Sequence, residues 1–134
     1  MFGALDISTS GLVAQRTRLD VISANITNAE TILDANGNYA PFQRRVAALA
    51  AGDAETGEGM GVHVREIQLV NSPPILKYEP DSPYANQDGY VGYPNISPVI
   101  EQMNAMEAAR AYEANISVIE ATKSMLSVSL QILT

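Results

Sequence analysis

The stretch "SPVIEQMNAMEAARAYEANISVIEATKSMLSVSLQILT", residues 97 to 134, predicts one long helix. Ser97 can cap its start, Pro98 suits the first helical position, and Glu101 lies in the early turns, where the helix dipole favours a carboxylate. No Gly or Pro interrupts residues 99 to 134. At about 1.5 Å per residue, this helix would be roughly 50 Å long.

Apolar residues recur along this helix at steps of three and four in two neighbouring rows. A two-stranded seam requires a narrower apolar face, so the pattern predicts a helix that packs on more than one side. The first row is Ala105, Ala109, Tyr112, Ile116, Ile119, Leu126, Leu130 and Leu133, and the second is Ala111, Ala114, Val118, Ala121, Met125, Val128 and Ile132.

A second helix is predicted at the start of the chain, within residues 1–31. Its apolar residues recur at a seven-residue step, and Gly11 with the preceding serines predicts fraying of the first turns. The residues at that step are Leu5, Leu12, Leu19 and Ile26, and Ile22 and Ala29 fill two of the alternate positions.

The middle of the chain, residues 32–96, contains clusters of turn-forming residues such as "AGDAETGEGMG" and "EPDSPYANQDG". Between them, "VHVREIQLV" predicts a strand, and "PILKYEP" and "GYVGYP" predict two short extended segments. The expected fold is therefore mainly α. Long N- and C-terminal helices pack as a coiled-coil-like pair, and a small strand- and loop-rich insert separates them. The domain boundaries are 1–31, 32–96 and 97–134.

The wide apolar face of the second helix raises a physical problem, because an antiparallel helix pair covers only one row. An apolar patch of that extent is typical of an interaction surface, so we expect the free monomer to be partly ordered and to gain structure on assembly. The predicted interface residues are Leu5, Leu12, Leu19, Ile22, Asn25, Ile26, Asn28, Tyr112, Ile116, Ile119, Met125, Leu126, Leu130 and Leu133.

The composition excludes several functions. The net charge is −7 and no basic stripe forms, so nucleic acid is not an expected partner. The chain has no cysteine, which excludes disulfides and thiolate metal sites. The start shows no secretory signal pattern, and no apolar run approaches the length needed to span a bilayer, so direct membrane insertion is not expected.

No catalytic, cofactor or metal site is predicted. His63 is the only histidine, it lies between two valines in a predicted strand, and a solvated or cross-strand role suits it better than a metal site. No G-x-S-x-G, calcium-loop or phosphate-binding glycine motif is present. The sequence therefore predicts a protein that is not an enzyme.

The segment "SANITNAET", residues 23 to 31, carries Asn25 and Asn28 where the first helix should end. Asn tolerates left-handed backbone angles, so one reading is a helix C-terminal cap. The other is a buried polar lock, in which amides on a packing seam fix the register of the helices. Spacing alone favours the cap slightly.

"SANITNAET" also resembles the S-x-N-[IL]-A-N-x-x-T element of flagellar axial proteins, which comprise rod, hook and hook-associated subunits. Thr27 departs from that pattern, where the family usually has Ala. Three further stretches are similar to the proximal rod proteins of the bacterial flagellar basal body, the short C-type subunits. They are "SGLVAQRTRLDVISANI", "DGYVGYPN" at residues 88 to 95, and "ARAYEANISVIEATKSML" at residues 109 to 126; "LDANGNYAPFQRRVAAL" is a looser match.

The resemblance implies a structural subunit of the flagellar rod, which crosses the periplasm and transmits torque from motor to hook. It implies export by the flagellar type III apparatus without a cleaved signal. The implied partners are other proximal and distal rod subunits, copies of the same chain and the export apparatus. A soluble coiled-coil adaptor that binds a single helical partner is the alternative, and a wall hydrolase is disfavoured because no acid–base pair is evident.

Overall fold

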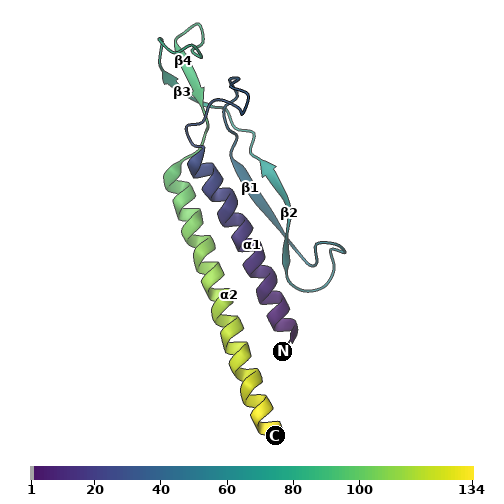
Figure 1. Ribbon diagram of the computed structural model, residues 1–134. Helices are drawn as coiled ribbons and strands as arrows, with labels where there is room; N and C mark the ends of the chain where they lie inside the picture. The colour runs from purple at the N-terminus through teal and green to yellow at the C-terminus, as the bar shows by residue number, and fades with distance from the viewer. Residues whose placement is uncertain (1) are drawn as a thin grey trace.

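The computed structural model describes residues 2–134 as two long helices joined by two β-hairpins (Figure 1). The two terminal helices and the strand-containing insert agree with the predicted fold class, whereas coiled-coil packing of the helices stays a prediction. The elements are α1 (Phe2–Thr27), β1 (Arg45–Ala51), β2 (Val62–Leu69), β3 (Ile75–Tyr78), β4 (Tyr90–Tyr93) and α2 (Pro98–Leu133).

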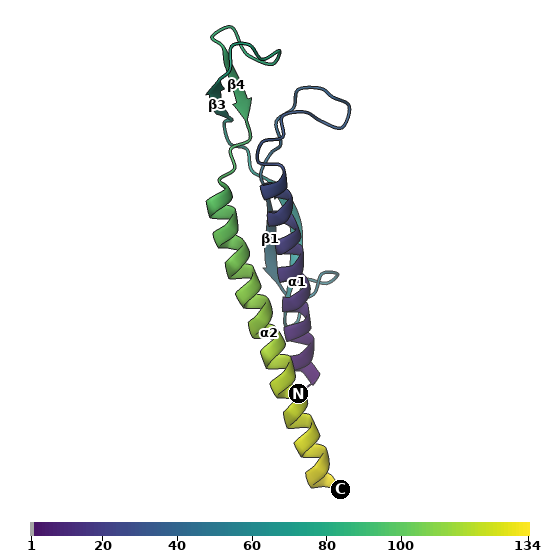
Figure 2. The ribbon, with the colours of Figure 1, turned by 60° about the vertical axis from the view of Figure 1, so that its left-hand side comes forward.

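Helix α2 begins where the sequence predicts. Ser97 has extended backbone angles, its hydroxyl accepts a hydrogen bond from the Ile100 N–H, and Pro98 follows at the first position. The helix runs for 36 residues, against 26 for α1. The helices lie side by side and antiparallel, so the last turns of α2 extend past the N-terminal end of α1 (Figure 2).

Helix α1 is continuous through Gly11, so the prediction of fraying at its start was wrong for the described residues. A Cβ atom on Gly11 would lie 2.7 Å from the side-chain nitrogen of Asn115 in α2. Glycine thus lets the two helices approach closely, and the contact with α2 offsets its low helix propensity.

The β1–β2 hairpin lies along α1 (Figure 1). Its strands pair antiparallel from Arg45 opposite Leu69 to Ala51 opposite Val62, with a register shift between Ala48 and Leu49. Strand β2 matches the predicted strand, but β1 was not predicted. The hairpin is fixed to α1 by Ser10, whose hydroxyl accepts a hydrogen bond from the Val62 N–H at 3.1 Å.

The β3–β4 hairpin stands at the other end of the molecule, beyond the helices (Figures 1 and 2). The two extended segments expected there form it. The apolar core is thin and dominated by small side chains, as expected for an insert too short to build a large core. The buried apolar residues are Ala14, Val21, Ile22, Ala47, Val91, Ile96 and Ala108.

Candidate assembly surface

The side of α2 that faces α1 mixes small and polar residues with the large residues Tyr112, Ile119 and Leu126. Its buried residues are Glu101, Ala108 and Thr122, and half-buried Asn115 lies against Gly11. Buried and half-buried positions follow alternating steps of four and three along this side. Those positions are residues 101, 105, 108, 112, 115, 119, 122, 126 and 129. Four of them belong to the first predicted row, and three more, residues 108, 115 and 129, lie one position away from a member of it.

Large apolar residues on the other sides of α2, and in the turns that extend past α1, are exposed. Only Tyr112, Ile119 and Leu126 among the large residues are half-buried on the α1 side at the positions given above, so most of the aliphatic surface of α2 remains in water, as expected for an interaction surface. The exposed residues and their exposed fractions are Val99 (66%), Ile100 (55%), Met103 (64%), Met106 (57%), Val118 (48%), Met125 (59%), Val128 (54%), Leu130 (63%), Ile132 (78%) and Leu133 (81%).

The last turns of α2, residues 125–133, form what we call the overhang, because they extend beyond the end of α1 (Figure 2). Five large apolar residues there are more than half exposed, and their mean exposed fraction is about two-thirds. Burial of such side chains contributes about 1.5–3 kcal/mol each when complete. Covering the overhang would therefore release roughly 5–10 kcal/mol before entropy costs.

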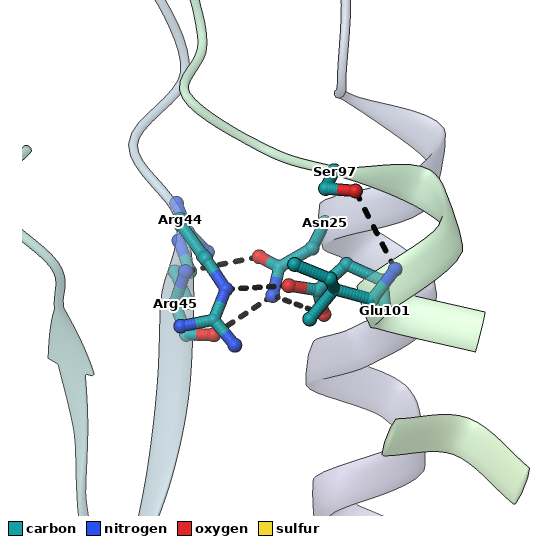
Figure 3. A network of polar contacts seen from close by, with 6 residues as sticks. Asn25, Arg44, Arg45, Ser97 and Glu101 are labelled. Atoms are coloured by element: carbon teal, nitrogen blue, oxygen red, sulfur yellow. Dashed lines mark hydrogen bonds and ion pairs between the residues drawn. The ribbon is translucent and has the colours of Figure 1, made fainter. Parts of the chain in front are cut away.

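A polar network joins α1, α2 and the start of β1 at the other end of the helix pair (Figure 3). The side chain of Asn25 is fully buried. Its amide nitrogen donates to the Arg45 carbonyl at 2.8 Å and to Glu101 Oε2 at 3.2 Å, and its oxygen accepts from the Arg45 N–H at 2.9 Å. Arg44 Nε donates to the other oxygen of Glu101. We call these four residues the polar junction.

The polar junction is internally satisfied. Glu101 is 1% exposed, and a buried carboxylate is strongly destabilising unless it is paired and hydrogen-bonded. Arg44 supplies the charge partner, and Asn25 supplies a donor that also fixes the backbone of β1. The junction therefore sets the relative placement of both helices and the first hairpin.

The two amides of "SANITNAET" have different roles. Asn25 forms the buried lock, whereas Asn28 closes the helix end: its amide donates to the Ala24 carbonyl at 2.8 Å and its oxygen accepts from the Thr31 hydroxyl at 3.2 Å. Among the described residues, only glycines have positive φ, so Asn28 does not use the left-handed cap conformation. Each alternative thus applies to one residue.

The predicted interface residues divide by burial. Ile22 and Asn25 lie inside the chain, which leaves them little surface for a neighbouring copy, while Met125, Leu130 and Leu133 are the most exposed. The remaining members are half-buried, namely Leu5, Leu12, Leu19, Ile26, Asn28, Tyr112, Ile116, Ile119 and Leu126.

Sequence reasoning missed part of this surface. Met103 and Met106 are more than half exposed near the start of α2, and Val13 on α1 is 61% exposed. The signal was available, since Met103, Met106 and Arg110 recur at steps of three and four opposite the buried positions. The pairing of Arg44 with Glu101 had no local signal, because 57 residues separate them.

Two titratable residues outside the junction, His63 and Tyr93, have structural partners. His63 lies in β2 opposite Ala50 of β1, and its Nδ1 atom is 2.8 Å from the carbonyl oxygen of Gly52, just after β1. Tyr93 donates to both oxygens of Glu79, and this hydrogen bond raises the pKa of the Tyr93 hydroxyl above its usual value. Within residues 2–134, no group of three potential metal-ligating side chains occurs.

Helix α2 also meets, by length and average composition, the requirements for a membrane-spanning helix, with a mean hydropathy of 1.2 in its most apolar segment. Membrane insertion was not expected from the sequence, because no uninterrupted apolar run is long enough to cross a bilayer. A mean hydropathy taken over a whole segment can stay high even when the segment contains charged residues such as Glu120 and Lys123. The same composition is expected of a helix whose apolar face is covered by protein.

Comparisons with known proteins match both helical regions. The family model described as "Flagella basal body rod protein" matches residues 5–31, and that described as "Flagellar basal body rod FlgEFG protein C-terminal" matches residues 87–132. The chain is 36% identical to the flagellar basal-body rod protein FlgC of Bacillus subtilis, over 98% of this chain and 97% of the relative. It is 38% identical to the FlgC of Aquifex aeolicus, over 93% of this chain and 91% of the relative. It is 36% identical to that of Salmonella typhimurium, over 94% of this chain and 92% of the relative.

Proposed function

Because this chain belongs to the FlgC family of flagellar basal-body rod proteins, we propose that it assembles through its terminal helices into the proximal part of the rod. As a family member it is a structural protein of the basal body and not an enzyme. In the proposal, the assembled rod crosses the periplasm and transmits torque from motor to hook. The chain reaches this place through the flagellar export apparatus, without a cleaved signal.

The exposed apolar surface of α2 is the observation that carries the proposal. Its residues extend from Val99 to Leu133, and the overhang has no part of α1 beside it. The polar junction holds the opposite end of the helix pair, so the surface is presented on a fixed frame. A shaft under torque requires such a frame, because twisting loads would otherwise turn the helices past each other.

The shape of the surface also supports an open assembly. The overhang lies at one end of the molecule and the β3–β4 hairpin at the other, so a contact that joins these unlike ends is heterologous and repeats without closing wherever its rotation does not complete a ring. Repetition of a contact of this kind generates a helical array. The partners in the proposal are copies of this chain and other proximal and distal rod subunits.

The free chain is less ordered at the overhang than at the junction in this proposal. In the described chain the large apolar residues of the overhang other than half-buried Leu126 are more than half exposed, and a helix end with so little cover unfolds locally at little cost. We therefore propose that only one region of the monomer, residues 125–133, is partly disordered and that it gains order when a neighbouring subunit covers it.

The test is Leu130→Asp, which places a charge at a position 63% exposed in the overhang. We expect rods and swimming to be lost, while the variant is still exported and its helicity in solution stays near that of the wild type. Ser127→Asp is the matched control, since it adds the same charge to the same turns at an exposed polar position. Leu126→Asp is less discriminating, because Leu126 is half-buried.

Normal rods and swimming in Leu130→Asp would overturn the assignment of the overhang as an assembly surface. The alternative, an adaptor with one helical partner, predicts a discrete complex of fixed mass. Analytical ultracentrifugation of the purified chain with rod subunits separates these outcomes, because rod assembly gives species of increasing mass.

A further inference from the structure

The β3–β4 hairpin with its connecting loop, residues 75–93, is here called the tip. Strands β3 and β4 contact each other and no other helix or strand of the described chain. Two short segments connect the tip to the rest of the molecule: residues 70–74, which contain Pro73 and Pro74, and residues 94–97, which contain Pro94. Figures 1 and 2 show the tip standing clear of the helix ends.

Two cavities flank the segments that join the tip to the rest of the molecule. One, of about 170 Å³, lies between the loop after α1 and the linking segments and is lined by residues that include Phe42, Arg44 and Pro74. The second, of about 140 Å³, is lined by residues that include Glu30 and Lys77. Both cavities also contact Tyr93 and Pro94, so space lies beside the segment that joins β4 to α2, although Pro94 and Ile96 themselves are buried.

The charged contact between the tip and the rest of the molecule is weak. Lys77 Nζ lies 3.7 Å from Glu30, and the two side chains are 45% and 82% exposed. Ion pairs with this exposure contribute little, because water screens them and two long side chains must be ordered. This ion pair does not fix the orientation of the tip.

The contact that does hold the tip comes from Tyr39, in the loop after α1. That loop is closed on itself, since the Ala40 N–H donates to the Ile32 carbonyl at 2.8 Å, and its start is tied back by the Thr31 N–H, which donates to the Asn28 carbonyl at 3.1 Å. The Tyr39 hydroxyl donates to the Gly92 carbonyl at 2.8 Å, and its ring stacks on Tyr84 with centroids 5.6 Å apart. A Cβ atom on Gly92 would lie 2.9 Å from the Tyr39 hydroxyl, so glycine leaves room for the contact.

We propose that the tip is a hinged contact arm and that Tyr39 is the residue that latches it. When the latch is released, the tip turns about the two proline-containing segments, and the flanking cavities provide the space. The purpose of this motion rests on the proposed function: a hinged arm lets identical chains meet unlike neighbours at different levels of a rod. The mechanical claim itself concerns the isolated chain.

The test measures the orientation of the tip by electron–electron double resonance. The chain has no cysteine, so Gln87→Cys in the tip and Gln102→Cys on α2, both exposed, accept spin labels specifically. We expect a narrow distance distribution in this background. Tyr39→Ala should widen it at least twofold, and Tyr39→Phe, which keeps the stack, should widen it less.

Two further variants complete the design. Gly92→Ala should broaden the distribution because it displaces the Tyr39 hydroxyl, and Asn36→Ala, an exposed change in the same loop, should leave it unchanged. Circular dichroism reports whether the helices remain intact. The proposal is overturned if Tyr39→Ala and Gly92→Ala keep the wild-type distribution, or if the wild type is already as broad as Tyr39→Ala. Neither result bears on the overhang, which Leu130→Asp tests separately.

Discussion

Replacing Asn25 with alanine tests the polar junction directly. The change removes three hydrogen bonds, of 2.8, 2.9 and 3.2 Å, and leaves the Arg45 N–H, the Arg45 carbonyl and one Glu101 oxygen without this partner. Each buried polar group left unpaired costs about 1–3 kcal/mol. Three such groups would sum to about 3–9 kcal/mol, and because the two bonds to Arg45 are only part-buried we expect the free energy of unfolding to fall by roughly 3–6 kcal/mol, a large part of the ~5–15 kcal/mol typical of a domain.

Urea unfolding of the purified chain, followed by circular dichroism at a helix-sensitive wavelength, measures this loss. With a slope of about 2 kcal/mol per molar urea, the midpoint should fall by roughly 1.5–3 M. Asn28→Ala is the matched control, because Asn28 is half-buried and donates only within its own helix. It should cost less than about 1.5 kcal/mol.

Asn25→Asp is a second test of whether the polar junction stabilises the fold. It is nearly isosteric and keeps an acceptor for the Arg45 N–H, but it removes the donor and places a second carboxylate beside Glu101. At neutral pH it should destabilise the chain at least as much as Asn25→Ala. If Asn25→Ala unfolds within about 1 kcal/mol of the wild type, or costs no more than Asn28→Ala, the junction does not hold the helices as argued here.

Three further predictions follow from the geometry. Gly11→Val should destabilise the helix pair by about 1–3 kcal/mol in the same urea assay because it meets Asn115, and adding Asn115→Ala should recover part of the loss. The raised pKa of Tyr93 means that its hydrogen bond to Glu79 stabilises the fold fully below the ordinary tyrosine pKa, and that this stabilisation is lost as the pH rises through the pKa of Tyr93 in the folded chain. Ultraviolet titration should show one tyrosine that ionises at a higher pH than the others, and Glu79→Gln should remove that difference. Amide hydrogen exchange should be slow in α2 near the junction and fast in residues 125–133, and uniform protection along α2 would contradict the uncovered overhang.

Local patterns were sufficient to predict the helices and three of the four strands. The start of α2 was signalled by Ser97 and Pro98, whose capping chemistry is local. Strand β1, "RVAALAA", was missed because its alanines favour a helix in isolation, and it is extended because it pairs with β2 and packs on α1. Tertiary contacts decided that segment.

The candidate surface was predicted in outline and corrected in detail. Apolar rows on α2 indicated a helix with two contact sides, but the fully buried residues against α1 are small or polar, and the large residues of the first row are at most half-buried there. The sequence could not show this, because Asn115 is accommodated only by Gly11, and Glu101 only by partners 57 and 76 residues away. Glu107 likewise pairs with Arg18 of α1 at 3.4 Å, a partner 89 residues away in the sequence.

The overhang gives this molecule a direction. Copies joined end to end would all point the same way, so a growing stack would offer bare α2 turns at one extremity and hairpins at the other. The two extremities would then differ in chemistry: the end formed by α2 would be apolar, and the end formed by the hairpins would be rich in tyrosine and carboxylates. An arriving copy would therefore dock in only one sense at each extremity.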